Sequence, residues 1–167
     1  MMVSTKGRYA LRIMADLAEN QEGGPVSLKD IAERENIGIK YLEIIVSSLN
    51  KNGLLKSVRG KNGGYMLNRE PKEYTIASIL NAAEGSLAPV ACVSDGDCEN
   101  APSCKTYVLW KELDDVIEDF LSSKTLAEAF FVCLDIFYFY TGQYTLYYRI
   151  QDRYLLLYRY RCASSLF

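Results

Sequence analysis

The sequence predicts a mainly α-helical protein with one short β-hairpin and a long helix that follows it. Apolar residues recur at three- and four-residue steps over 5–20, 39–52 and 106–121, which is the period of an amphipathic helix. Two short apolar runs flank a turn rich in Gly and Asn at 60–64, and this pattern predicts a hairpin. A segment rich in Gly, Pro, Ser and Asp at 92–104 is typical of a loop and separates the long helix from the rest.

The three helices at the start of the chain have recognisable ends. The first is predicted to end at 23–25, a Gly-Gly-Pro sequence. A short second helix is expected after Ser27, which can cap it, with Asp30 at the position three residues on where a carboxylate is favoured. The third is predicted over 39–52, and Gly53 is expected to adopt a left-handed conformation that ends it. Its expected inward positions are Leu42, Ile45, Val46 and Leu49.

The order of these elements along the chain indicates which helical fold they form. Strands are predicted at 54–59 and 65–67, around the turn. Helix, helix, turn, helix and then hairpin is the order of a winged helix-turn-helix, in which the third helix enters the major groove of DNA and the hairpin forms the wing. A further helix is predicted at 76–83, before the loop.

The long helix carries more apolar surface than one small domain needs. We therefore expect its stripe to continue across a two-fold dimer interface and the helix to serve as a dimerisation helix, although packing within its own domain is the alternative. The stripe consists of Val108, Leu109, Leu113, Val116, Ile117, Phe120 and Leu121.

Charge divides the chain into regions. Residues 1–72, the expected winged helix-turn-helix, hold twelve Lys and Arg against eight Asp and Glu, whereas residues 73–130, the expected cysteine loop and dimerisation helix, hold three against eleven. A basic first half suits a polyanion such as double-stranded DNA. The alternative is that these charges only solvate the surface.

Residues 131–167 form an atypical aromatic tail that holds eight of the thirteen tyrosines. It has neither a helical nor an alternating period, so we interpret it as a non-native extension, such as a frameshift product; an aromatic interaction segment is the alternative. Its longest uncharged run is 13 residues, which is shorter than the roughly 20 that a membrane-spanning helix needs. We expect no membrane association.

Three cysteines, Cys92, Cys98 and Cys104, follow one another at strict intervals in the polar loop. With no signal peptide visible, we expect a reducing cytoplasm, in which spaced cysteines bind metal more often than they form disulfides. The gaps are longer than those of zinc ribbons, so the pattern favours iron–sulfur chemistry over a structural zinc site. Ordinary loop cysteines or a redox dithiol are the alternatives. The chain has no histidine, which removes the commonest general base, and we expect no enzyme.

On these residues the chain resembles the Rrf2 family of bacterial winged-helix regulators, and within it the branch of iron–sulfur cluster regulators. The resemblance implies a homodimer on a pseudo-palindromic operator and a cluster on the cysteine loop, with 2Fe–2S favoured over the 4Fe–4S cluster of a sibling branch that senses nitric oxide. It extends from residue 2 to about 129 and includes the three cysteines, Leu109-Trp110, and the motifs STKGRYA at 4–10, IKYLE at 39–43, KNGL at 51–54, SVRG at 57–60 and GGY at 63–65.

The fourth ligand of such a cluster is open. The cluster regulators carry a histidine three residues after the last cysteine, where this chain has Tyr107. The nitric-oxide sensors use an acidic residue near the N-terminus, where this chain has Arg8, which cannot bind a metal. Tyr107, a small thiol, water or a loop carboxylate are candidates, the carboxylates being Asp95, Asp97 and Glu99.

For DNA, the third helix and the wing supply the candidates. Tyr41 can pack against a thymine methyl or sugar and bond a phosphate, and Glu43 can accept from a cytosine amine. Arg59 suits a narrow minor groove. The alternatives are a half-buried packing role for Tyr41 and a solvated charge for Glu43. The expected phosphate contacts are Lys40, Lys56 and Lys61, with Lys6 and Arg8 as further candidates.

Together these features predict a transcriptional regulator, expected to act as a repressor, that senses iron–sulfur cluster status, oxygen, nitric oxide or redox state and controls cluster-assembly genes. The alternatives are a family member without a cluster or with zinc that acts through a partner protein, or a small redox protein.

Overall fold

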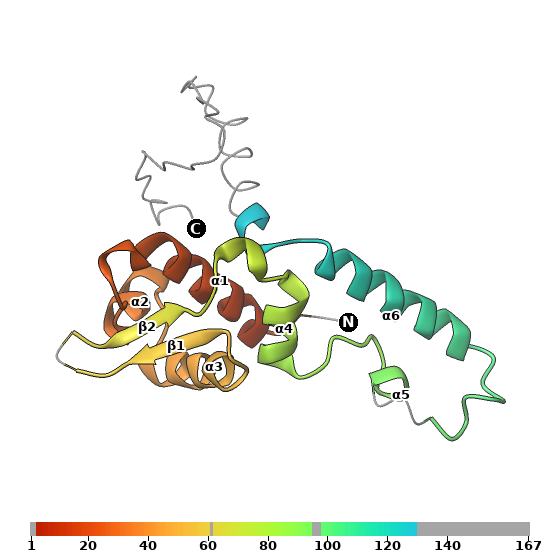
Figure 1. The fold of residues 1–167 in the computed structure, drawn as a ribbon. Coiled ribbons are helices and arrows are strands. Elements are labelled where there is room, and N and C mark those ends of the chain that lie inside the picture. Colours follow the sequence, from red (N-terminus) through yellow and green to blue (C-terminus); the bar gives the residue numbers. More distant parts are fainter. Residues whose placement is uncertain (1–2, 61, 95–97, 130–167) are drawn as a thin grey trace, which may run out of the picture.

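The computed structural model describes residues 3–60, 62–94 and 98–129 (Figure 1). The described chain is mainly helical with one two-stranded antiparallel hairpin, so the predicted fold class is confirmed. The predictions for 131–167 concern residues outside these ranges. The elements are α1 (Thr5–Asn20), η1 (Gln21–Gly23), α2 (Leu28–Glu35), α3 (Ile39–Lys51), β1 (Leu55–Val58), β2 (Gly64–Leu67), η2 (Pro71–Glu73), α4 (Ile76–Glu84), α5 (Ala91–Ser94) and α6 (Tyr107–Ser122).

The predicted start of the second helix and the predicted cap of the third are confirmed, whereas α1 ends at Asn20, and η1 rather than the helix continues to Gly23. The Ser27 hydroxyl accepts a hydrogen bond from the Asp30 amide at 3.2 Å and caps α2. Asn36 ends α2 in a left-handed conformation, with φ of 52°. Gly53 has φ of 71°, which lets the chain turn after α3 so that the Leu54 amide donates to the Leu49 carbonyl at 3.0 Å.

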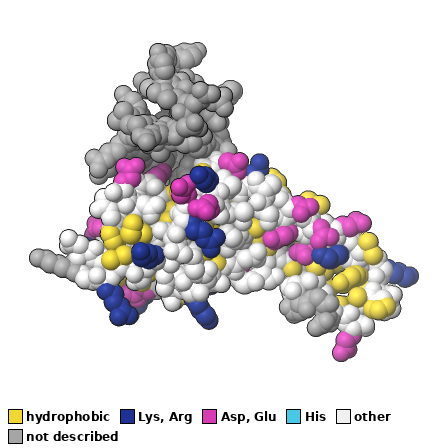
Figure 2. Space-filling model, in the orientation of Figure 1, with side chains coloured by type: hydrophobic (Ala, Val, Ile, Leu, Met, Phe, Trp, Pro, Cys, Tyr) yellow, Lys and Arg dark blue, Asp and Glu magenta, His cyan; other side chains and the backbone are white. Residues whose placement is uncertain are grey.

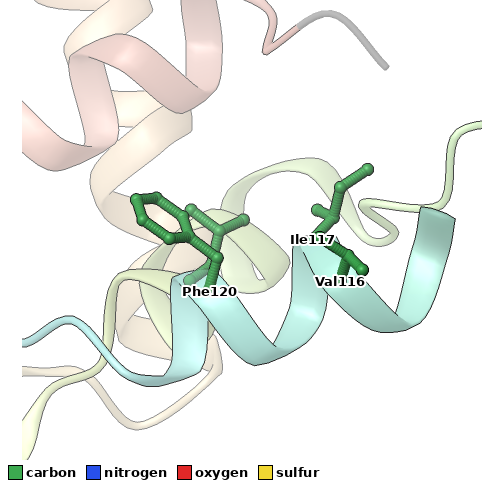
Figure 3. Close-up of a pocket in the computed structure, with 4 residues that line it drawn as sticks. Val116, Ile117 and Phe120 are labelled. Carbon is green, nitrogen blue, oxygen red and sulfur yellow. The ribbon is translucent and has the colours of Figure 1, made fainter.

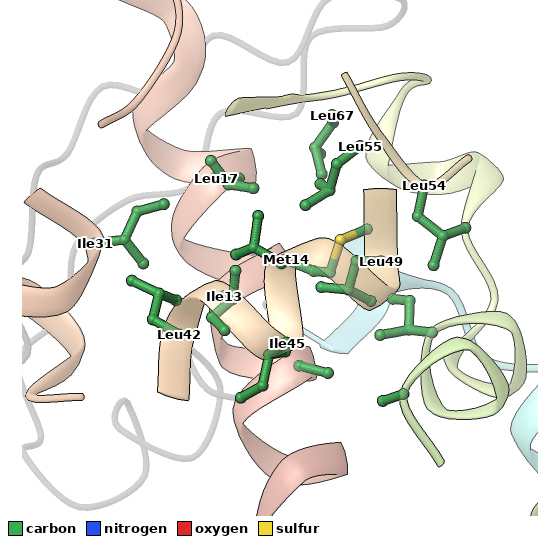
Figure 4. Close-up of a cluster of buried hydrophobic side chains, with 14 of the residues drawn as sticks. Ile13, Met14, Leu17, Ile31, Leu42, Ile45, Leu49, Leu54, Leu55 and Leu67 are labelled. Atoms are coloured by element: carbon green, nitrogen blue, oxygen red, sulfur yellow. The ribbon is translucent and has the colours of Figure 1, made fainter. Parts of the chain in front are cut away.

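The core lies between α1, α2, α3, α4 and the hairpin (Figure 4). All four residues predicted to face inward from α3 are fully buried, as are Ile13 and Leu17 of α1 and Ile31 of α2. Each such side chain contributes roughly 1.5–3 kcal/mol when it is removed from water. Leu126, which follows α6, also enters this core, and its amide donates to the Tyr74 carbonyl at 2.8 Å.

The hairpin is joined to the segment before α2 at the end of its ladder that lies next to the turn. β1 and β2 pair with Leu55 opposite Leu67, and a short bridge adds Val26 beside Tyr65, with both amide-to-carbonyl hydrogen bonds at 2.8–2.9 Å. A Cβ atom at Gly64 would overlap the Val26 carbonyl, so only glycine allows this close approach of two backbones.

The cysteine segment differs from the prediction in one respect. A loop was expected throughout 92–104, but α5 forms one helical turn that includes Cys92. The segment Ala91–Ser94 precedes the Gly- and Asp-rich residues, and Val93 is buried, which stabilises the turn. α6 extends away from the winged part of the molecule, and α5 packs beside it (Figure 1).

Candidate nucleic-acid interface and cysteine loop

The helix α3 divides into a buried face and an exposed face. Its apolar residues at i, i+3, i+4 and i+7 lie in the core, which leaves the opposite side in solvent. The predicted DNA contacts Lys40 and Glu43 are both exposed on that side. Ile44 and Ser47 are exposed beside them. The exposed face is therefore free to enter a groove.

Tyr41 is braced at the edge of this face. It is half-buried, and its ring packs edge-on against Tyr9 of α1, with 6.0 Å between centroids and 82° between planes. Arg12 lies over the Tyr9 ring at 5.1 Å, and its Nε donates to the Glu35 carboxylate at 2.6 Å. Tyr9 and Arg12 were not among the predicted site residues, because their link to Tyr41 arises only when α1 crosses α3.

The wing places two predicted basic residues in solvent. Lys56 on β1 and Arg59 just after it are exposed, whereas Lys61 lies outside the described residues. The Gly63 amide donates to the Gly60 carbonyl at 3.0 Å within the connection between the strands. β1 packs against α3, so the wing and the exposed face of α3 belong to one rigid unit. Figure 2 shows basic side chains projecting along the lower edge of the winged part and acidic side chains gathered over α6.

An ion pair between a buried carboxylate and a partly exposed guanidinium joins α2 to α1. Arg34 donates to both carboxylate oxygens of Asp16, at 2.5 and 2.7 Å, and the Asp16 side chain is only 4% exposed. The hydrogen bond to Asp16 raises the pKa of Arg34. Burial, and then the neighbouring Asp16 and Glu35 carboxylates, raise the pKa of Glu19. The prediction missed this pair, which sets the angle between the first two helices of the helix-turn-helix.

The end of α4 joins α1 to α3. Glu84 accepts hydrogen bonds from the Ser4 hydroxyl at 2.6 Å and from the Gly7 amide at 3.0 Å, so its carboxylate lies at the N-terminus of α1. Lys6 Nζ donates to the Ala83 carbonyl. One residue earlier, the Ala82 carbonyl accepts from the Ser48 hydroxyl of α3 at 2.8 Å. The chain then leaves toward the cysteine segment.

The three predicted cysteines belong to the segment that joins α4 to the start of α6, and α5 of this segment lies beside α6 (Figure 1). Cys92, Cys98 and Cys104 are all free thiols of intermediate exposure. Tyr107 begins α6 and is half-exposed, and Glu99 is exposed, whereas Asp95 and Asp97 lie outside the described residues. Within the described ranges, no three Cys, Asp or Glu side chains are close enough together to hold a metal ion.

The donor chemistry nevertheless suits an iron–sulfur cluster. Iron in such clusters is bound by thiolates, and these three thiols are free and reachable from solvent. The Cys104 sulfur lies 3.5 Å from the Thr106 hydroxyl, and this hydrogen bond, followed by one from the Thr106 backbone, lowers the pKa of the Cys104 thiol. A lower pKa favours the thiolate that binds metal. The residues therefore fit the group by type, and closing the segment around it requires the loop to move.

The helix α6 presents an unpartnered apolar face. None of its residues is buried in the described chain. Five residues of the predicted stripe are exposed, with Val116 at 64% and Phe120 at 61%, whereas Ile117 and Leu121 are half-buried and Leu121 packs against the cluster of Ile76, Leu80 and Leu87. Val116, Ile117, Phe120 and Leu121 line an open apolar pocket (Figure 3). Packing within its own domain therefore accounts for only part of this stripe, and the dimer interface stays a prediction. Among the described residues, no helix is both long enough and apolar enough to cross a membrane.

Comparisons with known proteins agree with this architecture. A family model described as Rrf2, iron-dependent transcriptional regulator, matches residues 3–130. The HTH-type transcriptional regulator IscR of Escherichia coli is 41% identical over 128 residues, which cover 77% of this chain and 79% of IscR. The solved structure of CymR, the global cysteine regulator of B. subtilis, is 41% identical with a TM-score of 0.63 and matches 77% of this chain and 95% of CymR. The structure of T. potens IscR is 41% identical with a TM-score of 0.61, over 80% of this chain and 88% of that one.

Proposed function

The chain belongs to the Rrf2 family of transcriptional regulators, and from this premise we propose that it is a homodimeric operator-binding regulator that responds to an iron–sulfur cluster on its cysteine loop. Its relatives are regulators of transcription, a family without enzymatic activity. The observation that carries the proposal is the exposed face of α3, with Lys40 and Glu43, held rigidly beside a wing that presents Lys56 and Arg59. This arrangement is the one that a winged helix presents to a major groove and its flanking minor groove.

Each DNA-binding residue has a distinct proposed role. Glu43 accepts a hydrogen bond from a cytosine amine, and Tyr41, braced by Tyr9, contacts the neighbouring sugar, phosphate or thymine methyl. Arg59 enters the minor groove. Lys40, Lys56 and Lys61 neutralise phosphates, which positions the protein without reading sequence.

The cluster is proposed to be held by Cys92, Cys98 and Cys104, with Tyr107 as a candidate fourth ligand and 2Fe–2S as the favoured type. Such a cluster supplies a site that oxygen or nitric oxide can destroy and that cellular iron–sulfur supply can refill. The three thiols are spread between α4 and α6, from Cys92 in α5 to Cys104 just before α6, and genes of cluster assembly are the proposed targets. We place the protein in the cytoplasm, where its DNA and its reduced thiols would both be found.

The dimer is proposed to form through α6. Its exposed residues, including Leu113, Val116 and Phe120, would be covered by the same face of a second copy. An isologous contact of this kind relates the two winged units by two-fold symmetry, so that each can bind one half of a palindromic operator.

The cysteine loop and the DNA-binding face of α3 have a candidate route of coupling through α4. In the structure α5 packs on α6, and the covalent path from the loop toward α3 runs back through the end of α4. There the Ser48 hydroxyl and the Ala82 carbonyl join α3 to α4. A change in the loop that alters this end of α4 would reach the exposed face of α3.

Two measurements test the proposal. Protein purified without air should be brown and contain iron and acid-labile sulfide, and replacement of Cys92, Cys98 and Cys104 by serine should abolish all three signals. Cys133 and Cys162 provide the matched control, because their replacement by serine should leave the colour unchanged. Salt-dependent binding to duplex operator DNA should persist in both variants, with an affinity that differs between the cluster-loaded and cluster-free forms at one salt concentration. Colourless, iron-free anaerobic protein would refute the cluster.

A second candidate is a cluster-free or zinc-binding regulator that acts through a partner protein. The observation that favours a regulator without metal is that the described cysteines are not gathered into a metal-binding group, together with the similarity to CymR, whose structure is described as that of a cysteine regulator. Colourless protein with zinc, or without metal, that still binds DNA would favour this candidate. A small redox protein would bind no operator.

A further inference from the structure

Ile44 is an exposed aliphatic side chain on the face of α3 that is directed at DNA. It is 59% exposed, whereas the next residue, Ile45, is fully buried. Within the described ranges, Ile44 belongs to neither hydrophobic cluster and is not among the partly buried residues packed against them. Core packing therefore does not explain a large apolar residue at this position.

The surroundings of Ile44 are polar. Lys40 lies one helical turn earlier and Ser47 nearly one turn later, and all three are exposed on the same side as Glu43. A helical side chain leans toward the N-terminus of its helix, so Ile44 covers the surface next to Lys40. Isolated apolar residues are common on protein surfaces. This one, however, is flanked by the base-reading and phosphate-binding candidates.

We propose that Ile44 is a specificity-determining residue that packs against the C5-methyl group of a thymine, in a base pair next to the one contacted by Glu43. The inference rests on the proposed operator binding. The thymine methyl is the apolar feature that base pairs present in the major groove, and apolar side chains read it by contact. A β-branched side chain has few χ1 rotamers, so Ile44 loses little freedom when it makes that contact.

The charges around Ile44 favour DNA over a protein partner as the occupant. A second copy or a partner helix that covered Ile44 would also bury Glu43 and Lys40, two side chains that have no ion-pair partner among the described residues. Burial of an unpaired charge is costly. In the major groove, by contrast, the carboxylate meets base amines and the ammonium meets phosphates.

The test removes single methyl groups from the DNA. The full chain is used to select operators from a random duplex pool, and each thymine of the selected site is then replaced by deoxyuracil, which lacks only the C5-methyl group. At one thymine in each half-site we expect the affinity to fall about fourfold, the factor that corresponds to one buried methyl group. Ile44→Ala should bind the thymine operator at least fourfold more weakly and should show no further loss with uracil.

Ile39→Ala is the matched control, because Ile39 is also an exposed isoleucine of α3, at 46%. Ile39→Ala should lose as much affinity as the parent does when the thymine is replaced by deoxyuracil. The free energy of unfolding of Ile44→Ala should match that of the parent, because only an exposed side chain is removed. Two results would overturn the inference: no thymine at which uracil weakens binding, or an uracil effect in Ile44→Ala equal to that of the parent. If the parent selects no sequence and binds duplex DNA without salt dependence, the proposed operator binding fails and this inference falls with it.

Discussion

Removal of Arg34 should lower the free energy of unfolding by more than removal of the Asp16 charge, although both changes break the same ion pair. The two variants to compare are Arg34→Met, which keeps most of the aliphatic stem, and Asp16→Asn, which keeps the volume of the carboxylate. In the native pair the Asp16 side chain is 4% exposed and the Arg34 side chain is 38% exposed. The partner left behind is therefore a buried carboxylate in Arg34→Met and a partly solvent-exposed guanidinium in Asp16→Asn.

The magnitudes follow from that difference. Loss of Arg34 leaves a buried carboxylate, with the Asn20 amide at 3.3 Å as its remaining side-chain hydrogen bond among the described residues. Breaking a fully buried pair costs roughly 3–5 kcal/mol. Because Arg34 is partly exposed and water can enter, we expect a loss of about 2–3 kcal/mol. Loss of the Asp16 charge leaves a guanidinium that water already reaches, and about 1 kcal/mol is expected.

Urea unfolding followed by far-ultraviolet circular dichroism measures these losses, at one protomer concentration because a dimer unfolds in a concentration-dependent way. The single tryptophan, Trp110, is a poor probe because it lies on α6. Arg12→Met is the control, since its pair with Glu35 is more exposed and should contribute less than about 1 kcal/mol. Equal losses in Arg34→Met and Asp16→Asn, or a larger loss in Asp16→Asn, would refute the reasoning from burial.

Three further predictions concern the core, the dimer and the wing. Tyr74→Phe should cost about 1–3 kcal/mol, because the buried hydroxyl donates to the Leu54 carbonyl at 2.9 Å and accepts from the Arg69 amide at 2.7 Å. Burial raises the pKa of Tyr74 in the folded protein. The contribution of Tyr74 to the free energy of unfolding is therefore complete below its unfolded pKa of about 10 and is lost as the pH rises through the pKa of the folded state. If stability falls as steeply with alkaline pH in Tyr74→Phe as in the parent, this explanation is contradicted. Phe120→Glu should shift the protein toward monomer in analytical ultracentrifugation, because it places a charge on the apolar face of α6, and an unchanged dimer would exclude that face as the interface. Arg59→Ala should weaken operator binding and reduce the slope of log affinity against log salt by about 1, because a cation in the minor groove displaces counterions, and an unchanged affinity and slope would show that Arg59 does not enter that groove.

Local signals account for the parts of the fold that the sequence predicts. Ser27 and Gly53 mark helix ends through chemistry that acts within a few residues, and both were located correctly. The apolar period of α3 likewise predicts its buried face. The helical turn at Cys92 was missed because Gly, Pro and Asp dominate the segment that follows it, whereas burial of Val93 depends on tertiary packing.

The contacts that organise the site depend on residues distant in sequence. Asp16 and Arg34 are ordinary surface residue types in a sequence, and their pairing appears only when α1 and α2 pack together. The same is true of Glu84, whose partners lie about eighty residues earlier at the start of α1. Lys40 and Glu43 were placed in solvent by helical period alone, but their roles toward DNA stay predictions.

The tight approach at Gly64 limits how this protein can acquire new operator preferences. Any side chain there would collide with the Val26 carbonyl, so the first residue of β2, next to the turn, cannot vary without displacing the strand from the segment before α2. Diversity introduced by selection or by a designed library must therefore fall on the tip, near Arg59, and on the outward face of α3. Gly64 therefore keeps the start of β2 in one position, while the side chains proposed to contact DNA can be exchanged without changing the fold.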